Sequence, residues 1–438
     1  MENILEQTNV KNMNKNKRIF PIYKMLAWDL LFYYAISFLF LTEVKGFSAS
    51  NVLLLDVFYT LAFLIFQIPC TFLIDKLGKK NALIIGNILI AIYILMIIVF
   101  NNYNVLIVAN MIWGFGYLIK GVCETDILFD SIPRSPERGE KFSKIDGRGS
   151  SYYYYFEAFS CLITGLLYVV NPYIPMVLCL ICCILSAYIS TKFENIITQE
   201  GTKSQFTTKV STFSKAKKYF KELKYSFRFI FKSKRLKSLL LFYGVFAGIL
   251  TLLTTYRKSL LADLNISATY FGVIFAILGI LAAISSKYSA FLNRKFKNKT
   301  LAILAISTLL SMIFSGIAVI INIPITPTII FIFIMFAIQH LFKGPFYSLG
   351  KQYLGNFSTH KIRTKILMAN DLVTGIFKAL IILVGSFFLD ITTTAYASII
   401  LGCILTLIVI AILEYMKTRI GLKPEQYKKS DIEFIELK

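Results

Sequence analysis

TFLIDKLGKK, residues Thr71 to Lys80, is the stretch from which the rest of the chain is understood. A long apolar run ends there on Asp75 and enters a basic turn. A hydrocarbon core about 30 Å thick is crossed by roughly 20 apolar residues, so residues 51–74 are predicted to form a membrane-spanning helix. Gly78 can adopt the positive φ that a tight helix exit needs, and a second span begins directly after the turn.

The decapeptide resembles the signature between the second and third helices of the major facilitator superfamily. That signature reads glycine, three residues, aspartate, Arg or Lys, any residue, glycine and two basic residues. All but one of its fixed positions are matched, by Asp75, Lys76, Gly78, Lys79 and Lys80. Thr71 stands where the family has the glycine that lets two helices approach closely, so that contact is expected to be looser here. The alternative is a positive-inside turn of any polytopic membrane protein.

Short segments of the first half of the chain have similar counterparts in the second half. FLIDKLGKK at 72–80 has a counterpart, FLNRKFKNK, at 291–299. LFY triplets at 31–33 and 241–243, and Lys-Gly pairs at 120–121 and 343–344, are separated by similar lengths of chain. A six-helix unit used twice is the pattern of parallel repeats in the superfamily that the chain resembles.

The composition is that of a membrane protein. The 438 residues are 56% hydrophobic and 16% charged, with a mean hydropathy of +0.66, which leaves too little polar surface to cover a soluble globule. The net charge of +23 would suit a nucleic-acid-binding protein, but such proteins gather basic residues on one groove-facing surface. Here they are distributed between apolar runs, so no nucleic-acid partner is predicted.

Apolar runs of spanning length predict an all-α polytopic membrane protein with 12 transmembrane helices in two six-helix bundles. The predicted spans are 24–42, 51–74, 81–100, 104–128, 150–171, 173–192, 238–257, 267–290, 300–322, 328–350, 366–389 and 394–416. When alternate connections are assigned to one side, that side holds nearly all Lys and Arg, and the other holds Lys45, Arg257 and Lys258. By the positive-inside rule, both termini and the central connection are cytoplasmic.

Four segments follow from this topology: a bundle at 1–192, a cytoplasmic basic linker at 193–237, a second bundle at 238–416 and a cytoplasmic tail at 417–438. Apolar residues recur in the linker at steps of three and four, at Phe213, Ala216, Phe220, Leu223, Phe227 and Ile230. Such a basic amphipathic helix would bind anionic lipid headgroups. The simpler alternative is a tether between the bundles.

No cofactor or metal is predicted. All seven cysteines lie within apolar spans, where they pack as small hydrophobic residues, so neither a disulfide framework nor a zinc site is expected. The N-terminal segment has no apolar core followed by a small-residue cleavage site, so no removable signal peptide is expected. We expect a monomer.

Polar residues within the spans are the candidate site residues, because a charge in hydrocarbon usually faces an aqueous cavity or a partner. In the fourth span one stripe carries Trp113, Gly116, Lys120 and Glu124, and a neighbouring small-residue stripe for close packing carries Gly114, Gly121 and Thr125. GFG at 114–116 and CETDILFDS at 123–131 look like the fourth span of a group of bacterial facilitator-family carriers of mostly unassigned substrate. The resemblance extends to GLKPEQY at 421–427 and implies a multi-pass protein of the bacterial plasma membrane.

Asp126 and Asp130, near the end of the fourth span, approach the level of the basic turn. We expect Asp130 to pair with that turn and to form a latch that holds one conformation. The latch residues are Asp75, Lys76, Gly78, Lys79, Lys80 and Asp130. With its counterpart around Lys295, the turn would stabilise the outward-facing state.

Other candidates lie in the fifth, tenth and eleventh spans. The tenth carries a stripe of Phe336, Gln339 or His340, Lys343 and Tyr347; the eleventh carries Asp371, Thr374 and Lys378; the fifth carries Glu157, Cys161, Thr164 and Tyr168. Pro345 and Pro69 are each expected to kink or loosen a helix. Each charge either lines the cavity or belongs to an internal pair, such as Lys120 with Glu157 or Asp371 with Lys378.

Acids outnumber lysines within the spans. They are Asp29, Asp56, Glu124, Asp126, Glu157 and Asp371, against Lys120, Lys343 and Lys378. A carboxyl surrounded by hydrocarbon can bind and release a proton as water access alternates. Glu124 is the first candidate for proton coupling and Asp29 the second, and His340 could relay protons. We therefore expect a proton-coupled carrier that exports a small amphipathic or cationic compound.

Three alternatives stay open. Uptake or facilitated diffusion of a sugar, amino acid or short peptide would use the intramembrane lysines to bind a carboxylate or phosphate. A membrane-embedded enzyme is remote, because the two histidines, His340 and His360, have no acid at catalytic spacing and GxSxG is absent. A sensor that does not transport is harder to exclude, although no soluble signalling domain is attached.

Overall fold

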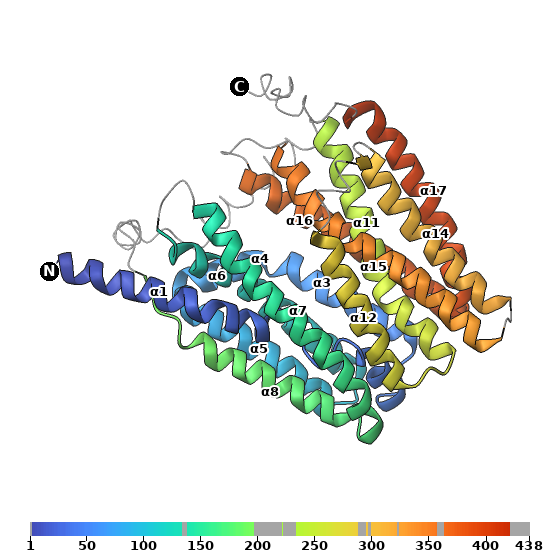
Figure 1. Cartoon of the computed structure of the whole chain (residues 1–438), viewed down its shortest axis with the longest axis horizontal. Helices are drawn as coiled ribbons and strands as arrows, with labels where there is room; N and C mark the ends of the chain where they lie inside the picture. Colours follow the sequence, from blue (N-terminus) through green and yellow to red (C-terminus); the bar gives the residue numbers. More distant parts are fainter. Residues whose placement is uncertain are drawn as a thin grey trace. The chain divides into compact units, whose positions relative to one another are not determined.

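The computed structural model describes residues 2–133, 138–196, 221, 234–287, 295–296, 299–321, 324–356 and 363–420. Within these ranges nearly every residue is helical and no strand occurs (Figure 1), so the all-α prediction is confirmed. The amphipathic stripe of the linker, most of the FLNRKFKNK turn and the GLKPEQY motif lie outside the described residues.

The first part of the chain forms α1 (Glu2–Ala27), α2 (Ser37–Leu39), the π-helix η1 (Phe40–Val44), α3 (Ala49–Ile65), α4 (Gln67–Leu77), α5 (Lys79–Val99), α6 (Tyr103–Asp130), α7 (Arg138–Val170) and α8 (Tyr173–Ser190). The second part forms α11 (Lys234–Asp263), α12 (Ala268–Lys287), α14 (Thr300–Ile320), α15 (Ile325–Asn356), α16 (Arg363–Ile391) and α17 (Thr394–Ile420).

By length and composition, 10 helices of the described chain can cross a membrane, or up to 11 if α3 and α4 are one bent span. The break between α3 and α4 falls at Phe66, one turn before Pro69. Pro69 has no N–H to donate to the carbonyl of Ile65, so the helix is interrupted there, as expected. α15, by contrast, continues without a break through Pro345.

The first predicted span, residues 24–42, is not one helix. α1 ends at Ala27, residues 28–36 form bends and turns, and α2 and η1 follow. Phe32 has φ 62°, which few residues other than glycine adopt. Asp29 offers its carboxylate to the backbone N–H of Leu30 at 2.8 Å, and such a local side-chain acceptor competes with helical hydrogen bonding.

The chain divides into two compact units that are not the two halves of the sequence. Unit 1 comprises Met1–Ser37, Leu61–Lys217 and Ala268–Ala276, and unit 2 comprises Phe38–Thr60, Lys218–Ser267 and Ile277–Lys438. Each unit thus takes a short segment from the other half of the sequence. The four segment boundaries drawn from the sequence stay a prediction.

In unit 1, α5 packs against α6 and α8, and α1 packs against α7 and α8 (Figure 1). α5 and α6 approach closely at two glycines: a Cβ on Gly116 would lie 2.8 Å from the carbonyl oxygen of Gly86. Gly121, expected on the packing stripe, instead has open space around it. The close packing predicted for Gly121 is therefore wrong, because the face of α6 that meets α5 carries Gly116.

In unit 2, α11 packs against α16 and α17, and α14 packs against α15 and α17. α11 is the most enclosed of the candidate spans, with 83% of its apolar window buried. Large apolar side chains cover outward faces of other helices, such as Val170 of α7 (76% exposed) and Leu407 of α17 (69% exposed). An apolar exterior around buried polar groups is what a lipid environment requires.

Candidate substrate and proton pathway

Lys120 on α6 is buried at the end of α1. Its ammonium donates hydrogen bonds to the carbonyls of Ala27 and Trp28, the latter at 3.1 Å, and lies 4.0 Å from the centroid of the Tyr117 ring. The last carbonyls of a helix lack partners within the helix, and a cation is favourable at that end. Lys120 therefore closes the end of α1 at the point where the first predicted span is interrupted.

The acids Glu124 and Asp29 lie near Lys120. Asp29 accepts a hydrogen bond from the Tyr117 hydroxyl at 3.0 Å. Glu157, the partner considered from the sequence, instead accepts a hydrogen bond from Tyr153 at 2.9 Å. Lys120 does not pair with Glu157 in the described chain, because the end of α1 and two other acids occupy its surroundings.

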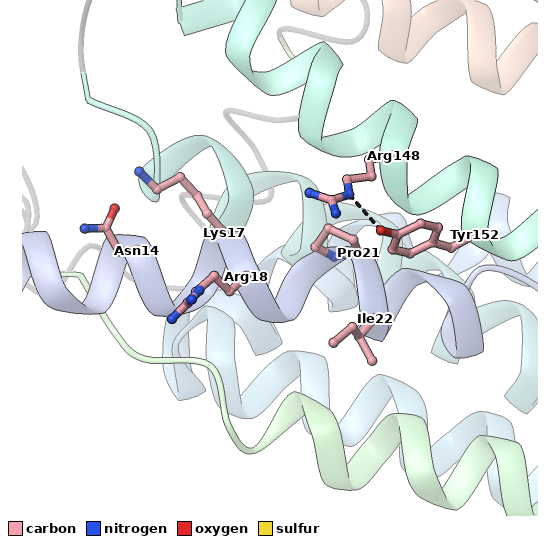
Figure 2. A pocket seen from close by; sticks show the side chains of 7 residues that line it. All are labelled: Asn14, Lys17, Arg18, Pro21, Ile22, Arg148 and Tyr152. Carbon is pink, nitrogen blue, oxygen red and sulfur yellow. Dashed lines mark hydrogen bonds between the residues drawn. The ribbon is translucent and has the colours of Figure 1, made fainter.

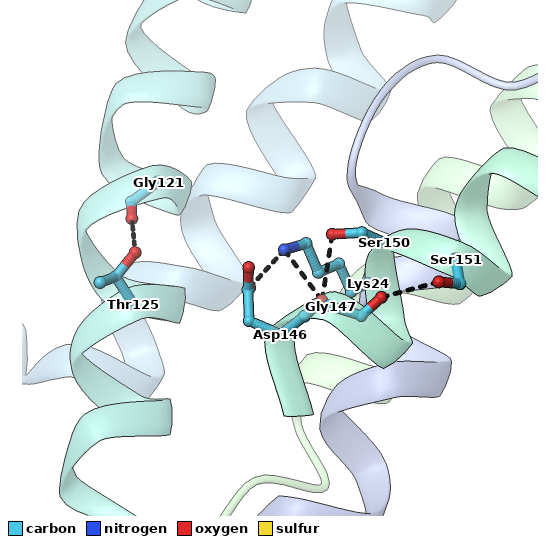
Figure 3. Close-up of polar contacts among 7 residues, drawn as sticks. All are labelled: Lys24, Gly121, Thr125, Asp146, Gly147, Ser150 and Ser151. Atoms are coloured by element: carbon cyan, nitrogen blue, oxygen red, sulfur yellow. Dashed lines mark hydrogen bonds and ion pairs between the residues drawn. The ribbon is translucent and has the colours of Figure 1, made fainter. Parts of the chain in front are cut away.

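Glu124 lies one turn beyond Lys120 on α6, and one of its carboxylate oxygens forms no hydrogen bond within the described chain. Its Oε2 is buried and has no hydrogen-bond partner among the described residues. The positive charges of Lys120 and Lys24 lie near Glu124. Lys24 is itself engaged: its ammonium forms an ion pair with Asp146 of α7 (Figure 3) and lies 4.4 Å from the Trp28 ring centroid. We call Lys24, Asp29, Lys120, Glu124 and Asp146 the α6 cluster.

Aromatic rings surround the α6 cluster. Trp113 stacks on Tyr93 of α5, with centroids 4.7 Å apart and planes 9° apart, and meets Tyr117 edge-on. Trp28 packs against Tyr153 of α7 at 5.3 Å. Trp113 therefore lies in an aromatic wall contributed by α5 and α6.

Arg257 and Gln339 join α11 to α15 in unit 2. Arg257, predicted in an external connection, lies within α11 and is 2% exposed, because the helix continues past residue 257 through the buried Leu260 and Leu261 to Asp263. Its Nη1 donates to Gln339 Oε1 at 3.0 Å. His340 is also buried, with Nδ1 3.1 Å from the Phe336 carbonyl oxygen, and the charges nearest it are Arg257 and Lys343.

Among the described side chains, the acid Asp56 of α3 lies near Lys378 of α16. Its carboxylate accepts a hydrogen bond from Thr255 at 3.4 Å, and Lys258 is also near it. Lys378 lies 5.8 Å from the Tyr59 ring centroid. The side chain of Asp371, considered as the partner of Lys378, lies outside the described side chains. We call Asp56, Arg257, Lys258, Lys343 and Lys378 the α11 cluster.

The turn between α4 and α5 contacts the end of α6. Lys79 Nζ lies 2.7 Å from Asp130 Oδ2 and 3.4 Å from Asp126 Oδ2, so the expected pairing of Asp130 is present and runs through Lys79. Gly78 has the positive φ expected, 78°, combined with a ψ of 157° that is almost restricted to glycine. Asp75 and Lys76 are exposed, and Lys80 is half-buried.

The sequence indicated the polar faces of single helices, but it missed several of the residues that interact with them. Lys24 lies at the start of the first predicted span and Asp146 in a polar segment before the fifth, so neither interrupts an apolar run. Asp56 was counted among the acids but was given no role. Arg257 was assigned to a connection because the apolar window ended before it. The apolar residues Leu260 and Leu261 could have indicated that the helix continues past Arg257. Nothing in the sequence indicated the Lys24–Asp146 pair.

A family model described as Major Facilitator Superfamily matches residues 25–322. Among solved structures, the nucleoside transporter NupG is 12% identical, with a TM-score of 0.71, covering 93% of this chain and 99% of that one. A bacterial homologue of the human lysosomal transporter Spinster is 14% identical, with a TM-score of 0.64 and coverage of 93% and 96%.

A peptide transporter POT, crystallised with alafosfalin, is 14% identical, with a TM-score of 0.58 and coverage of 94% and 95%. A sequence search of curated proteins gives no match. At these identities the solved structures share the fold, and together with the family model they indicate a transporter rather than an enzyme.

Proposed function

This chain belongs to the major facilitator superfamily and is a membrane transporter, and we propose that it couples movement of a small molecule to protons through Glu124. The observation that carries the proposal is the buried Oε2 of Glu124, which has no hydrogen-bond partner among the described residues. A buried carboxylate oxygen without a donor is costly, and the protonated, neutral acid costs less. Binding a proton would relieve that cost, and access to water on either side would release it.

Export of an amphipathic or cationic compound in exchange for protons is the first form of this proposal. It is supported by acids that stand among aromatic rings: Asp29 contacts Tyr117, and Glu157 contacts Tyr153, which packs on Trp28. Acids and aromatic faces both attract a cation, and the rings also bury its apolar part. Glu124 would then exchange a proton for the passing cation.

Uptake of an anionic nutrient is the second form, and the α11 cluster supports it. As far as its described side chains go, Lys258 and Lys378 lie near the carboxylate of Asp56, and Arg257 and Lys343 lie near His340. A guanidinium and ammonium groups in a low-dielectric site attract a carboxylate or phosphate. A substrate with such a group would enter together with a proton.

Orientation and gating form part of the same proposal. The distribution of Lys and Arg supports cytoplasmic termini in a bacterial plasma membrane. The Lys79 pair with Asp130 and Asp126 supports a latch that holds one conformation while it is closed. The amphipathic linker would bind anionic headgroups.

The experiment is transport by the protein reconstituted in liposomes that contain a pH-sensitive dye. Cationic dyes, amino acids, peptides and sugars are presented in turn, and the sign of the proton flux separates antiport from symport. Glu124→Gln is expected to abolish proton-driven uphill movement and to leave exchange without a gradient intact. The exposed acid Glu414, changed to Gln, is the matched control and should transport like the unaltered protein. Uphill transport retained by Glu124→Gln would refute the assignment.

A further inference from the structure

A cavity of about 720 Å³ lies between α1 and α7 in unit 1, and none of its lining residues belongs to the α6 cluster (Figure 2). Its lining comes from two helices and is mainly basic, with an apolar part. The lining residues are Asn14, Lys17, Arg18, Pro21, Ile22, Arg148 and Tyr152. None of the described lining residues is an acid.

The three cations of this cavity are not neutralised within the described chain. No ion pair joins Lys17, Arg18 or Arg148 to a described carboxylate, whereas neighbouring Lys15 pairs with Glu194 at 2.6 Å. That hydrogen bond from Lys15 holds the pKa of Glu194 below its ordinary value. Within the described chain the cavity therefore keeps its positive charge, while Lys15 on the adjacent turn of α1 is neutralised.

Arg148 is oriented by Tyr152 one turn further along α7. Its Nε donates to the Tyr152 hydroxyl at 2.8 Å, and its guanidinium lies 5.5 Å from the ring centroid (Figure 2). This bond uses one N–H of the guanidinium, so the fork of terminal nitrogens is left to bind an anion. A planar guanidinium fork matches the oxygens of a phosphate.

The cavity lies level with the ends of two spans. Asn16, on the turn of α1 that carries Lys17, donates to Ser131 Oγ at 3.1 Å and to the Glu194 carbonyl at 2.9 Å. Ser131 directly follows α6, and Glu194 follows α8. Helix ends of this kind mark the boundary between hydrocarbon and headgroups, which is where a lipid phosphate lies.

The cavity is also amphipathic along α1. Its basic part lies at Asn14 to Arg18, toward the chain end of α1, and its apolar part at Pro21 and Ile22, one turn closer to the span. Ile22 is 51% exposed and is available to an acyl chain. A free phosphate would use the basic part alone, whereas a phospholipid would use both.

We propose that this cavity binds the phosphate of an anionic phospholipid, with its acyl chains along Ile22. Lys17, Arg18 and Arg148 bind the phosphate oxygens, and basic pockets between membrane helices favour such headgroups. The site differs from the predicted amphipathic linker and does not depend on which substrate the protein moves. A bound lipid would join α1 to α7 beside the Lys24–Asp146 pair.

The test is native mass spectrometry of the detergent-purified full chain with equimolar phosphatidylglycerol and phosphatidylcholine. The unaltered protein is expected to retain phosphatidylglycerol preferentially. Arg18→Gln and Arg148→Gln should each weaken that retention about fivefold, since a basic residue near an anionic surface contributes about that factor. Lys11→Gln, an exposed cation of α1 outside the cavity, is the matched control and should retain the preference.

Three outcomes would overturn the proposal. One is equal retention of the two lipids by the unaltered protein. Another is an equal loss in Lys11→Gln, which would assign the effect to overall surface charge. The third is displacement of the lipid by millimolar inorganic phosphate, which would assign the site to a free anion. If either glutamine variant does not fold, Arg148→Lys keeps the charge, removes the fork, and should still lower retention.

Discussion

The α6 cluster of unit 1 and the α11 cluster of unit 2 bury charge in opposite balance. In the α6 cluster, Lys24 and Lys120 stand among three acids, Asp29, Glu124 and Asp146, and Lys120 also binds the backbone at the end of α1. In the α11 cluster, cations outnumber the described carboxylate. Among the described side chains, the α6 cluster is therefore richer in acids and the α11 cluster richer in cations.

The largest effect is expected when the central cation of the α6 cluster is removed. Lys120→Met would leave the carbonyls of Ala27 and Trp28 without their donor and two acids without their nearest cation. Breaking a buried charge network of this kind costs about 3–5 kcal/mol in the free energy of unfolding. Denaturation in detergent measures the loss, with exposed Lys192→Met as the control. A loss below about 1 kcal/mol would mean that the network is not what closes α1.

A smaller effect is expected from the packing that positions the α6 cluster. Gly116→Ala would place a Cβ 2.8 Å from the Gly86 carbonyl oxygen, so α5 and α6 must separate. Overpacking of this kind costs about 1–3 kcal/mol. Gly121→Ala, five residues on and in open space, should instead be neutral or stabilising by up to about 1 kcal/mol. Equal effects in the two variants, measured by thermal unfolding, would contradict the contact.

The α11 cluster is tested through Asp56 and Lys378. A double-mutant cycle of Asp56→Asn and Lys378→Met is expected to give a coupling of about 1 kcal/mol, because the two opposite charges lie near each other among the described side chains. The coupling should be smaller than the Lys120 effect, since no helix end depends on it. Strict additivity would separate the two residues and weaken the contrast between the clusters.

The smallest effect is expected at the half-buried pair of Lys79 and Asp130, which gives a baseline near the surface for both clusters. Lys79→Met should lower stability by about 0.2–1 kcal/mol and the difference should shrink in high salt. Lys76→Met, two residues before Gly78 and exposed, is the control with the same change of charge. A salt-independent loss at Lys79 would indicate that this pair is held away from solvent.

Much of the helix pattern could be predicted because hydrophobic run length is a local property. The residue range 51–74 was identified as a span, and the interruption caused by Pro69 followed from its missing N–H. The first span could not be predicted as broken. At the interruption, the Asp29 carboxylate accepts a hydrogen bond from the Leu30 N–H. There Lys120 of α6 also donates hydrogen bonds to the last carbonyls of α1 and to Trp28. The donor is distant in sequence, so no window around residue 29 contains it.

The candidate site divides in the same way. The stripe of Trp113, Lys120 and Glu124 is visible in the sequence because helical spacing places these residues on one face. Their partners are not visible. Lys120 could have paired with Glu157, but the fold places the end of α1 at Lys120. Among the described side chains, it also brings Asp56 of α3 near Lys378. Which glycine packs closely, Gly116 or Gly121, also depended on the rotation of α6 against α5.

The amino-acid sequence by itself determined that this is an all-helical membrane protein with a basic turn at 75–80, because lipid selects apolar runs and the positive-inside rule acts on connections. The tertiary structure alone decided which buried charges meet, where α1 ends, and that short segments of each half join the other unit. The physical reason is the separation along the sequence over which each interaction acts. Transfer into hydrocarbon is summed residue by residue along one helix, whereas an ion pair or close glycine contact exists only after two distant helices have packed.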